Sequence, residues 1–128
     1  MEISEEIYLV SDDLFRVGNS QSPRLDNVRE RDIEIVEREE ESVVLPDTGG
    51  ISAFSKINPR LRGTWWKCPA GTFYPPELRV VCDRERGTLR HYSIQPAFPM
   101  TLRLYQEKLR EFAGDFERVQ FFDGRRIA

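Results

Sequence analysis

The chain has 128 residues, of which 39% are apolar and 32% charged, and its net charge at pH 7 is −3. This length holds one domain with one hydrophobic core and excludes a multidomain protein. Residues 1–47 carry 14 acidic and 5 basic side chains, whereas residues 48–128 carry 8 acidic and 14 basic ones, so only the second part would attract an anionic ligand or an acidic partner.

The first elements are predicted from alternation and capping. Residues 12–18 alternate as a short strand does, with Phe15 and Val17 on one face and Arg16 on the face turned away from the core. A serine followed by proline is typical of a helix start and predicts a helix over residues 23–31.

The middle of the chain is predicted to contain two strands separated by a charged turn. Residues 32–37 alternate as an exposed strand does, and residues 42–45 form a buried one. Residues 38–41 are either a solvated turn or an acidic patch, which would bind a basic partner or shield the basic half of the chain. Turn chemistry follows at residues 46–50, and residues 51–56 are expected to form one helical turn.

The second half is predicted to contain a strand, a hairpin and a helix. An aromatic-rich strand covers residues 63–68, and a hairpin joins residues 78–83 to residues 89–95 through a glycine-containing loop. Apolar side chains at one-face spacing predict a helix that Pro99 opens and Gly114 ends: Leu102, Tyr105, Leu109 and Phe112. Residues 116–122 are either a short helix or a last strand. These elements favour the α+β class.

The two cysteines and the N-terminus indicate the compartment. Cys68 and Cys82 are too few for a zinc site or a disulfide scaffold, so we expect reduced core thiols. The acidic start lacks the order of a secretory signal peptide, and no apolar run reaches the roughly 18–20 residues of a membrane span. We therefore expect a protein that is cytoplasmic in the cell that makes it.

Three groups of residues are candidates for chemistry. Strand periodicity places the only histidine, His91, on one face with Ser93 and Gln95, which must then line a cleft or a solvated edge. The paired Gly49 and Gly50 let a backbone approach a ligand closely, and Ser52 beyond them is either a ligand-binding hydroxyl or a helix cap. Arg16 has a guanidinium suited to phosphate.

Three phrases of the sequence occur together in one known family: LPDTGGISAF at residues 45–54, YPPELRV at residues 74–80 and HYSIQPAFPM at residues 91–100. With this order the chain resembles the toxin family typified by the second type VI secretion exported effector of pseudomonads. The likeness extends loosely to residues 14–16. It implies one ADP-ribosyltransferase-like domain over residues 1–128, with mixed or antiparallel sheets and few helices.

The resemblance also implies site residues, a substrate and partners. NAD would be the substrate, with Arg16 on its diphosphate, Ser52 on its ribose and His91 in the same cleft. The family threonine before that serine is replaced by Ile51, and Glu77 is the candidate for a catalytic carboxylate. A toxin of this kind implies a cognate immunity protein, delivery into the cytoplasm of a target cell and a cytosolic acceptor.

The transferase reaction requires a rigid site. Cleavage between nicotinamide and ribose builds positive charge on the sugar, so the diphosphate and the ring must be held while that charge forms. Phe54 or Tyr92 would stack on the departing ring unless both are core residues. His91 would position the acceptor or accept its proton.

Two other functions fit the same residues. A small ribonuclease would use His91 as the acid, Glu77 as the base and arginines on the phosphate. A non-enzymatic binding module would keep the fold and present its acidic first part to a partner.

Overall fold

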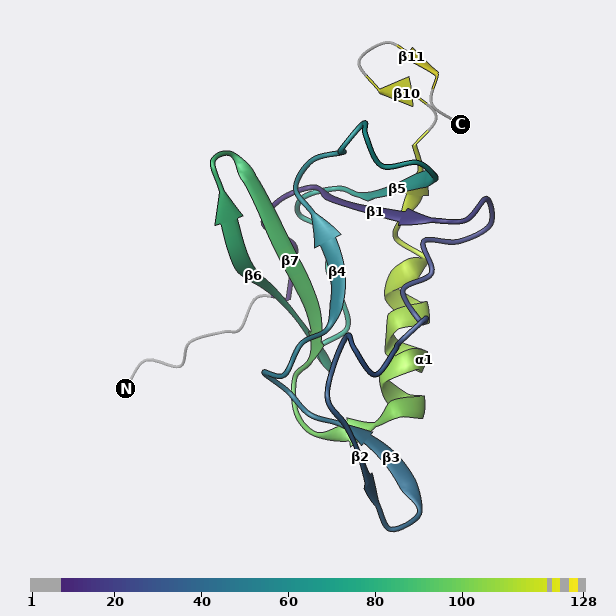
Figure 1. The fold of residues 1–128 in the computed structure, drawn as a ribbon, viewed down its shortest axis with the longest axis vertical. Helices are drawn as coiled ribbons and strands as arrows, with labels where there is room; N and C mark the ends of the chain where they lie inside the picture. Colours follow the sequence, from purple (N-terminus) through teal and green to yellow (C-terminus); the bar gives the residue numbers. More distant parts are fainter. Residues whose placement is uncertain (1–7, 120, 123–124, 127–128) are drawn as a thin grey trace.

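A computed structural model of the chain describes residues 8–119 and the backbone of residues 121–122 and 125–126. It has the predicted α+β class, with antiparallel sheets and one helix among the described residues. Figure 1 shows the helix along one side of the molecule, with strands beside it and beyond both of its ends. Within these residues no helix is both long enough and apolar enough to cross a membrane.

The largest sheet has six strands in the order β6-β7-β4-β1-β5-β9. Their bounds are β1 Leu14–Gly18, β4 Ile51–Phe54, β5 Thr64–Cys68, β6 Leu78–Arg86, β7 Leu89–Pro96 and β9 Glu117–Arg118. Strands β1 and β4 share a single residue pair, Phe15 with Phe54. Because of this narrow junction, β1 and β5 run across the direction of β4 and β7 (Figure 1). The sheet is therefore two halves joined at one point.

The remaining strands form two smaller sheets. Strands β2 (Ile35–Arg38), β3 (Glu41–Val44) and β8 (Met100–Thr101) pair in that order at the lower end of Figure 1. Strands β10 (Phe121–Phe122) and β11 (Arg125–Arg126) form a two-stranded ladder. Thus the charged segment predicted as a turn connects β2 to β3.

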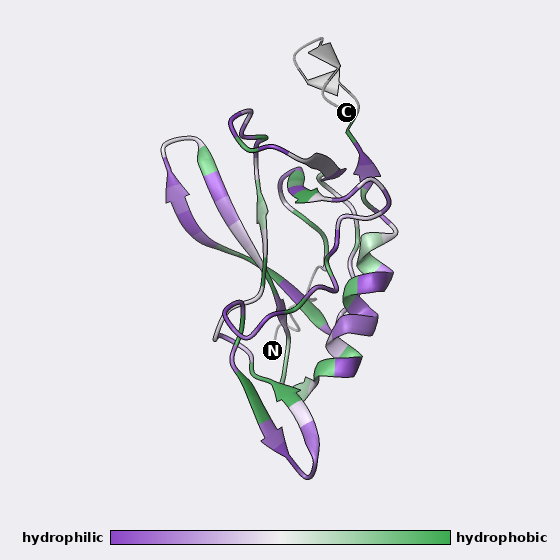
Figure 2. Cartoon of the chain, turned by 45° about the vertical axis from the view of Figure 1, so that its right-hand side comes forward, coloured by the Kyte–Doolittle hydropathy of each residue, from purple (hydrophilic) through white to green (hydrophobic). Residues whose placement is uncertain are grey.

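Helix α1, Leu102–Ala113, closes the core. The hydroxyl of Thr101 accepts the backbone N–H of Leu104 as an N-cap, at 3.1 Å. The predicted apolar stripe faces inward, and Figure 2 shows its apolar residues alternating with hydrophilic ones along the helix. Tyr105 is fully buried and donates its hydroxyl hydrogen to the backbone carbonyl of Ile94 in β7. The helix and the large sheet are thereby held together by packing and by one internal hydrogen bond.

The large sheet has a core face and an opposite face. Alternate residues of its strands are fully buried against α1 and the 25–33 segment, and they include Leu14, Ala53, Cys68, Leu78 and Ile94. Side chains at adjacent positions point the other way. Burial raises the pKa of the Cys68 thiol to about 11, so this thiol is inert at neutral pH.

Two predicted helical segments are wrong. Residues 23–31 form turns, because Arg24 has a φ of 53° and its carbonyl, like that of Pro23, accepts a hydrogen bond from a side chain. Residues 51–54 form β4 because they pair with β7 along their whole length. In both places tertiary contacts override a local capping signal.

The structure also differs from the predictions in the boundaries of two elements and in the exposure of one cysteine thiol. Strand β6 continues through the predicted loop to Arg86, so the hairpin turn lies at Gly87 and Thr88. Helix α1 begins after Pro99 and the two residues of β8 rather than at the proline. Both cysteines are free as expected, but Cys82 is exposed rather than in the core.

Candidate functional site

Ser52, Phe54 and His91 lie together on the face of the large sheet opposite the core. In the register of β4 and β7, Ser52 is opposite Ser93 and Phe54 is opposite His91, and directly opposed residues in antiparallel strands point to the same side. The rings of Phe54 and His91 meet edge to face, with centroids 5.2 Å apart. We call this surface, defined by Ser52, Phe54 and His91, the site face.

The predicted alternation of polar residues along β7 is confirmed, but two of these residues are buried rather than facing a cleft or solvent. Ser93 and Gln95 share the face of His91, yet they are only 2% and 7% exposed. The Gln95 amide nitrogen donates to the Ser93 hydroxyl at 3.3 Å, and the Gln95 carbonyl oxygen has no hydrogen-bond partner among the described residues. The row is therefore buried at one end and opens to solvent toward His91.

His91 is oriented by a carboxylate that the sequence did not point to. The pairing of β6 and β7 shifts between Cys82 and Arg84, which makes Asp83 the extra residue of a β-bulge. The Asp83 carboxylate contacts Nδ1 of His91 at 2.5 Å. A carboxylate only accepts hydrogen bonds, so Nδ1 carries the hydrogen and Nε2 of the neutral ring keeps its lone pair. In its neutral form His91 can therefore accept a proton at Nε2.

A small hollow of about 140 Å³ adjoins His91 and Phe54, and its other lining residues are Arg84, Arg86 and Leu89. Arg84 is opposite His91 and Arg86 is opposite Leu89 in the hairpin. The hollow therefore combines an imidazole, an aromatic ring and two guanidinium groups from one hairpin and β4.

The guanidinium of Arg16 donates hydrogen bonds to backbone carbonyls of the protein itself. Its Nε donates to the carbonyl of Pro23 at 2.9 Å, and its two terminal nitrogens donate to the carbonyls of Ser52, at 2.7 Å, and Arg24, at 3.2 Å. Burial lowers the pKa of Arg16 to about 10. In β1, Arg16 shares the side of Leu14, which is fully buried, so it points to the core face rather than away from it as predicted.

The structure does not bring Arg16 and His91 to one hollow. Arg16 lines a separate hollow of about 210 Å³ whose other basic residues are Arg24 and Arg29. Arg29 is paired there with Asp32 at 3.1 Å. Arg16 and Ser52 meet only through the Ser52 carbonyl, since their side chains lie on opposite faces of the sheet.

Gly49 and Gly50 lie against the protein's own backbone. A Cβ added at Gly49, where φ is 139°, would lie 2.1 Å from the carbonyl oxygen of Asp32. At Gly50 it would lie 2.4 Å from the carbonyl oxygen of Ile94 in β7. Gly49 therefore lets the turn pack tightly against the backbone of Asp32, and Gly50 lets it pack against β7, the strand that carries His91.

Glu77 and Tyr92 lie away from the site face. Glu77 pairs with Lys108 of α1 at 3.5 Å, and the six residues between it and Arg84, the partner of His91, correspond to roughly 20 Å of strand. Tyr92 is 4% exposed on the core side of β7 and donates its hydroxyl hydrogen to Asp12. The structure thus separates Glu77 from His91, the pair that a ribonuclease mechanism would require.

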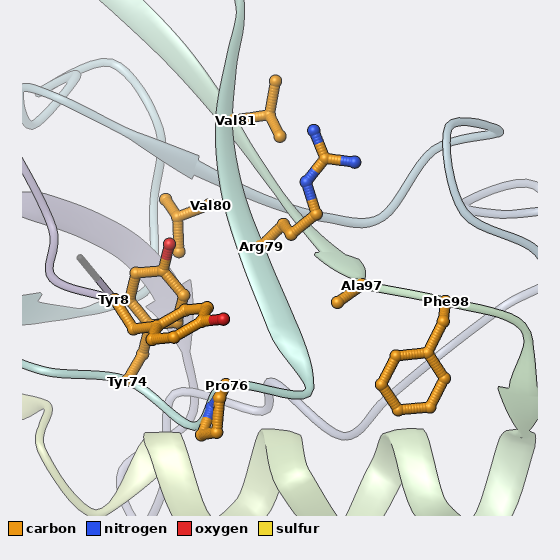
Figure 3. A pocket seen from close by; sticks show the side chains of 8 residues that line it. All are labelled: Tyr8, Tyr74, Pro76, Arg79, Val80, Val81, Ala97 and Phe98. Atoms are coloured by element: carbon orange, nitrogen blue, oxygen red, sulfur yellow. The ribbon is translucent and has the colours of Figure 1, made fainter. Parts of the chain in front are cut away.

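A further hollow of about 720 Å³ lies at the free edge of β6 (Figure 3). Figure 3 shows Tyr8 and Tyr74 at one end, Phe98 at the other and Arg79 between them. Arg79 forms an ion pair with Asp47 at 3.5 Å. None of the residues predicted to carry chemistry lines this groove.

Comparison with known proteins identifies one family for most of this chain. The family model described as Tse2 ADP-ribosyltransferase toxin matches residues 12–121. That span includes β1, the glycine turn, the whole β6–β7 hairpin and α1. No curated protein matches the chain.

Proposed function

The chain belongs to the Tse2 ADP-ribosyltransferase toxin family, and on this premise we propose that it cleaves NAD and transfers the ADP-ribose to an acceptor molecule. The observation that carries the proposal is the grouping of Ser52, Phe54 and His91 on one face of β4 and β7. In this reaction a hydroxyl can orient the ribose, an aromatic ring can stack on the nicotinamide and an imidazole can accept a proton beside the reacting sugar.

The reaction breaks one bond and forms another at C1′ of the nicotinamide ribose. The bonding pair leaves with nicotinamide, which departs as a neutral molecule. A nucleophilic O–H or N–H of the acceptor then supplies the pair for the new bond to C1′. Nε2 of His91 takes the acceptor's proton, because Asp83 engages Nδ1. With water as the acceptor, the same steps hydrolyse NAD.

Ser52 and Phe54 have distinct roles in this proposal. The Ser52 side chain is half-buried, and among the described residues its hydroxyl has no hydrogen-bond partner, so it is available to orient the ribose. Phe54 stacks on the departing ring beside His91. Arg16, Gly49 and Gly50 act indirectly by fixing the strands that carry these groups. We assign no chemical role to Glu77 or Tyr92.

The biological setting is part of the proposal. A toxin that consumes NAD endangers the cell that makes it, so we propose a cognate immunity protein and action in the cytoplasm of a recipient cell after type VI secretion. The structure does not favour the ribonuclease over the transferase, since Glu77 and His91 are far apart.

The test is nicotinamide release from NAD by the purified protein, together with transfer of label from NAD to components of a lysate. Replacement of His91 by Gln should lower label transfer about 100-fold or more, and Ser52→Ala should raise the KM for NAD. Ser42→Ala on β3 is the matched control, because among the described residues that hydroxyl bonds only to Glu37. Absence of both release and transfer in a preparation that is toxic to cells would contradict the proposal.

A further inference from the structure

The outer end of the β6–β7 hairpin holds two arginines whose charge the protein leaves unneutralised. Arg84 and Arg86 alternate on β6, so both point to the side on which they line the hollow beside His91 and Phe54. Among the residues that the structure describes, neither guanidinium takes part in a hydrogen bond or an ion pair. Figure 2 shows this end of β6 as hydrophilic, in contrast to the more hydrophobic residues nearer its start.

The acidic residues nearby are already engaged. Asp83 holds the imidazole of His91, and Glu85 pairs with Arg90 at 3.3 Å. Arg90 in turn pairs with Asp12 at 2.9 Å. The carboxylates of the hairpin therefore have partners of their own, and the hollow keeps an excess of positive charge.

We propose that Arg84 and Arg86 bind the pyrophosphate of the dinucleotide, an inference that rests on the proposed function for its natural ligand. A guanidinium matches two phosphate oxygens with two parallel hydrogen bonds. Two residues apart on one strand, the Cα atoms are about 7 Å from each other. Their long side chains can thus converge on adjacent phosphates.

Arg84 and Arg86 lie where the proposed reaction would place the pyrophosphate of NAD. The hollow they line shares Phe54 and His91 with the site face, so an anchored pyrophosphate places the attached ribose near the imidazole. Arg16, the arginine that sequence favoured for this task, already donates to three carbonyls. The hairpin arginines have all of their donors available.

The experiment measures the binding of inorganic pyrophosphate to the full chain by calorimetry, at low and at physiological salt. The variants are Arg84→Gln, Arg86→Gln and the double substitution. Arg24→Gln is the matched control, since it removes the same charge from the separate hollow that Arg16 lines. Both hairpin side chains are exposed, so melting temperatures should stay at the wild-type value.

We expect the double substitution to weaken pyrophosphate binding at least tenfold and the control to change it less than twofold. Equal weakening by Arg24→Gln, unchanged binding in the double variant or no binding to the parent protein would overturn the inference. Nicotinamide release from NAD is measured in parallel. Arginine-dependent pyrophosphate binding without release would refute the proposed function alone, whereas release that the double substitution leaves unchanged would refute the pyrophosphate site alone.

Discussion

Replacement of Arg16 by Met tests whether the first-strand arginine acts on the fold or on a ligand. The substitution keeps an apolar stem and removes the guanidinium, which donates to the carbonyls of Pro23, Ser52 and Arg24. Two of these bonds are partly buried, and hydrogen bonds from a charged donor contribute about 1.5–3 kcal/mol each. Because burial of the charge opposes them, as the pKa near 10 indicates, we expect a net loss of about 2–4 kcal/mol of unfolding free energy.

The assay is urea unfolding at pH 7 together with a thermal scan. A loss of that size corresponds to a fall of roughly 8–16 °C in melting temperature for a domain of this length. Arg16→Lys should recover less than half of the loss, since one ammonium does not reproduce three divergent N–H donors. The reasoning is refuted if Arg16→Met unfolds within about 0.5 kcal/mol of the wild type while binding of NAD is lost, because the guanidinium would then serve the ligand.

Three further substitutions report on other contacts. Gly50→Ala should destabilise the fold by about 1–3 kcal/mol in urea unfolding, because its Cβ would overlap the Ile94 carbonyl; a neutral effect would show that the turn moves freely from β7. Tyr105→Phe should lower the unfolding free energy by about 1–2 kcal/mol, since the buried Ile94 carbonyl loses its donor; a more stable variant would contradict this. Hydrogen bonds from Tyr92 and Arg90 lower the pKa of Asp12 below 3.8, so the stabilisation by its carboxylate is complete above about pH 4 and disappears as the pH falls through the folded-state value. The difference in unfolding free energy between the wild type and Asp12→Asn should therefore shrink below pH 4, and a constant difference down to pH 2 would disprove the assignment.

Local patterns predicted those parts of the fold that local physics determines. The β6–β7 hairpin follows from two alternating runs around Gly87, and α1 from its apolar stripe. The same alternation correctly grouped His91 with Ser93 and Gln95, and Phe15 with Val17. Periodicity relates residues on one strand to one another without saying which face is the core. For this reason Arg16 was placed on the wrong side.

The groups missed at the site depend on contacts that no local pattern encodes. Asp83 reaches His91 only because a bulge adds one residue to β6, and nothing in the run from Val81 to Arg84 signals that irregularity. Whether Arg84 and Arg86 keep an unpaired charge likewise depends on which neighbouring carboxylates already have partners. Segment 23–31 begins with a sequence typical of a helix start, but its first two carbonyls, those of Pro23 and Arg24, accept hydrogen bonds from Arg16 instead.

The junction between the two halves of the large sheet explains how Arg16 can matter for activity without touching a substrate. Only Phe15 and Phe54 pair across it, and the guanidinium of Arg16 adds a second link through the carbonyl of Ser52. Ser52 and Phe54 are both groups of the site face, so β1 fixes their position from the core side. Loss of Arg16 therefore acts on stability and on site geometry together. A loss of toxicity on substitution of Arg16 therefore identifies a ligand contact only when binding of NAD is lost while the unfolding free energy stays at the wild-type value.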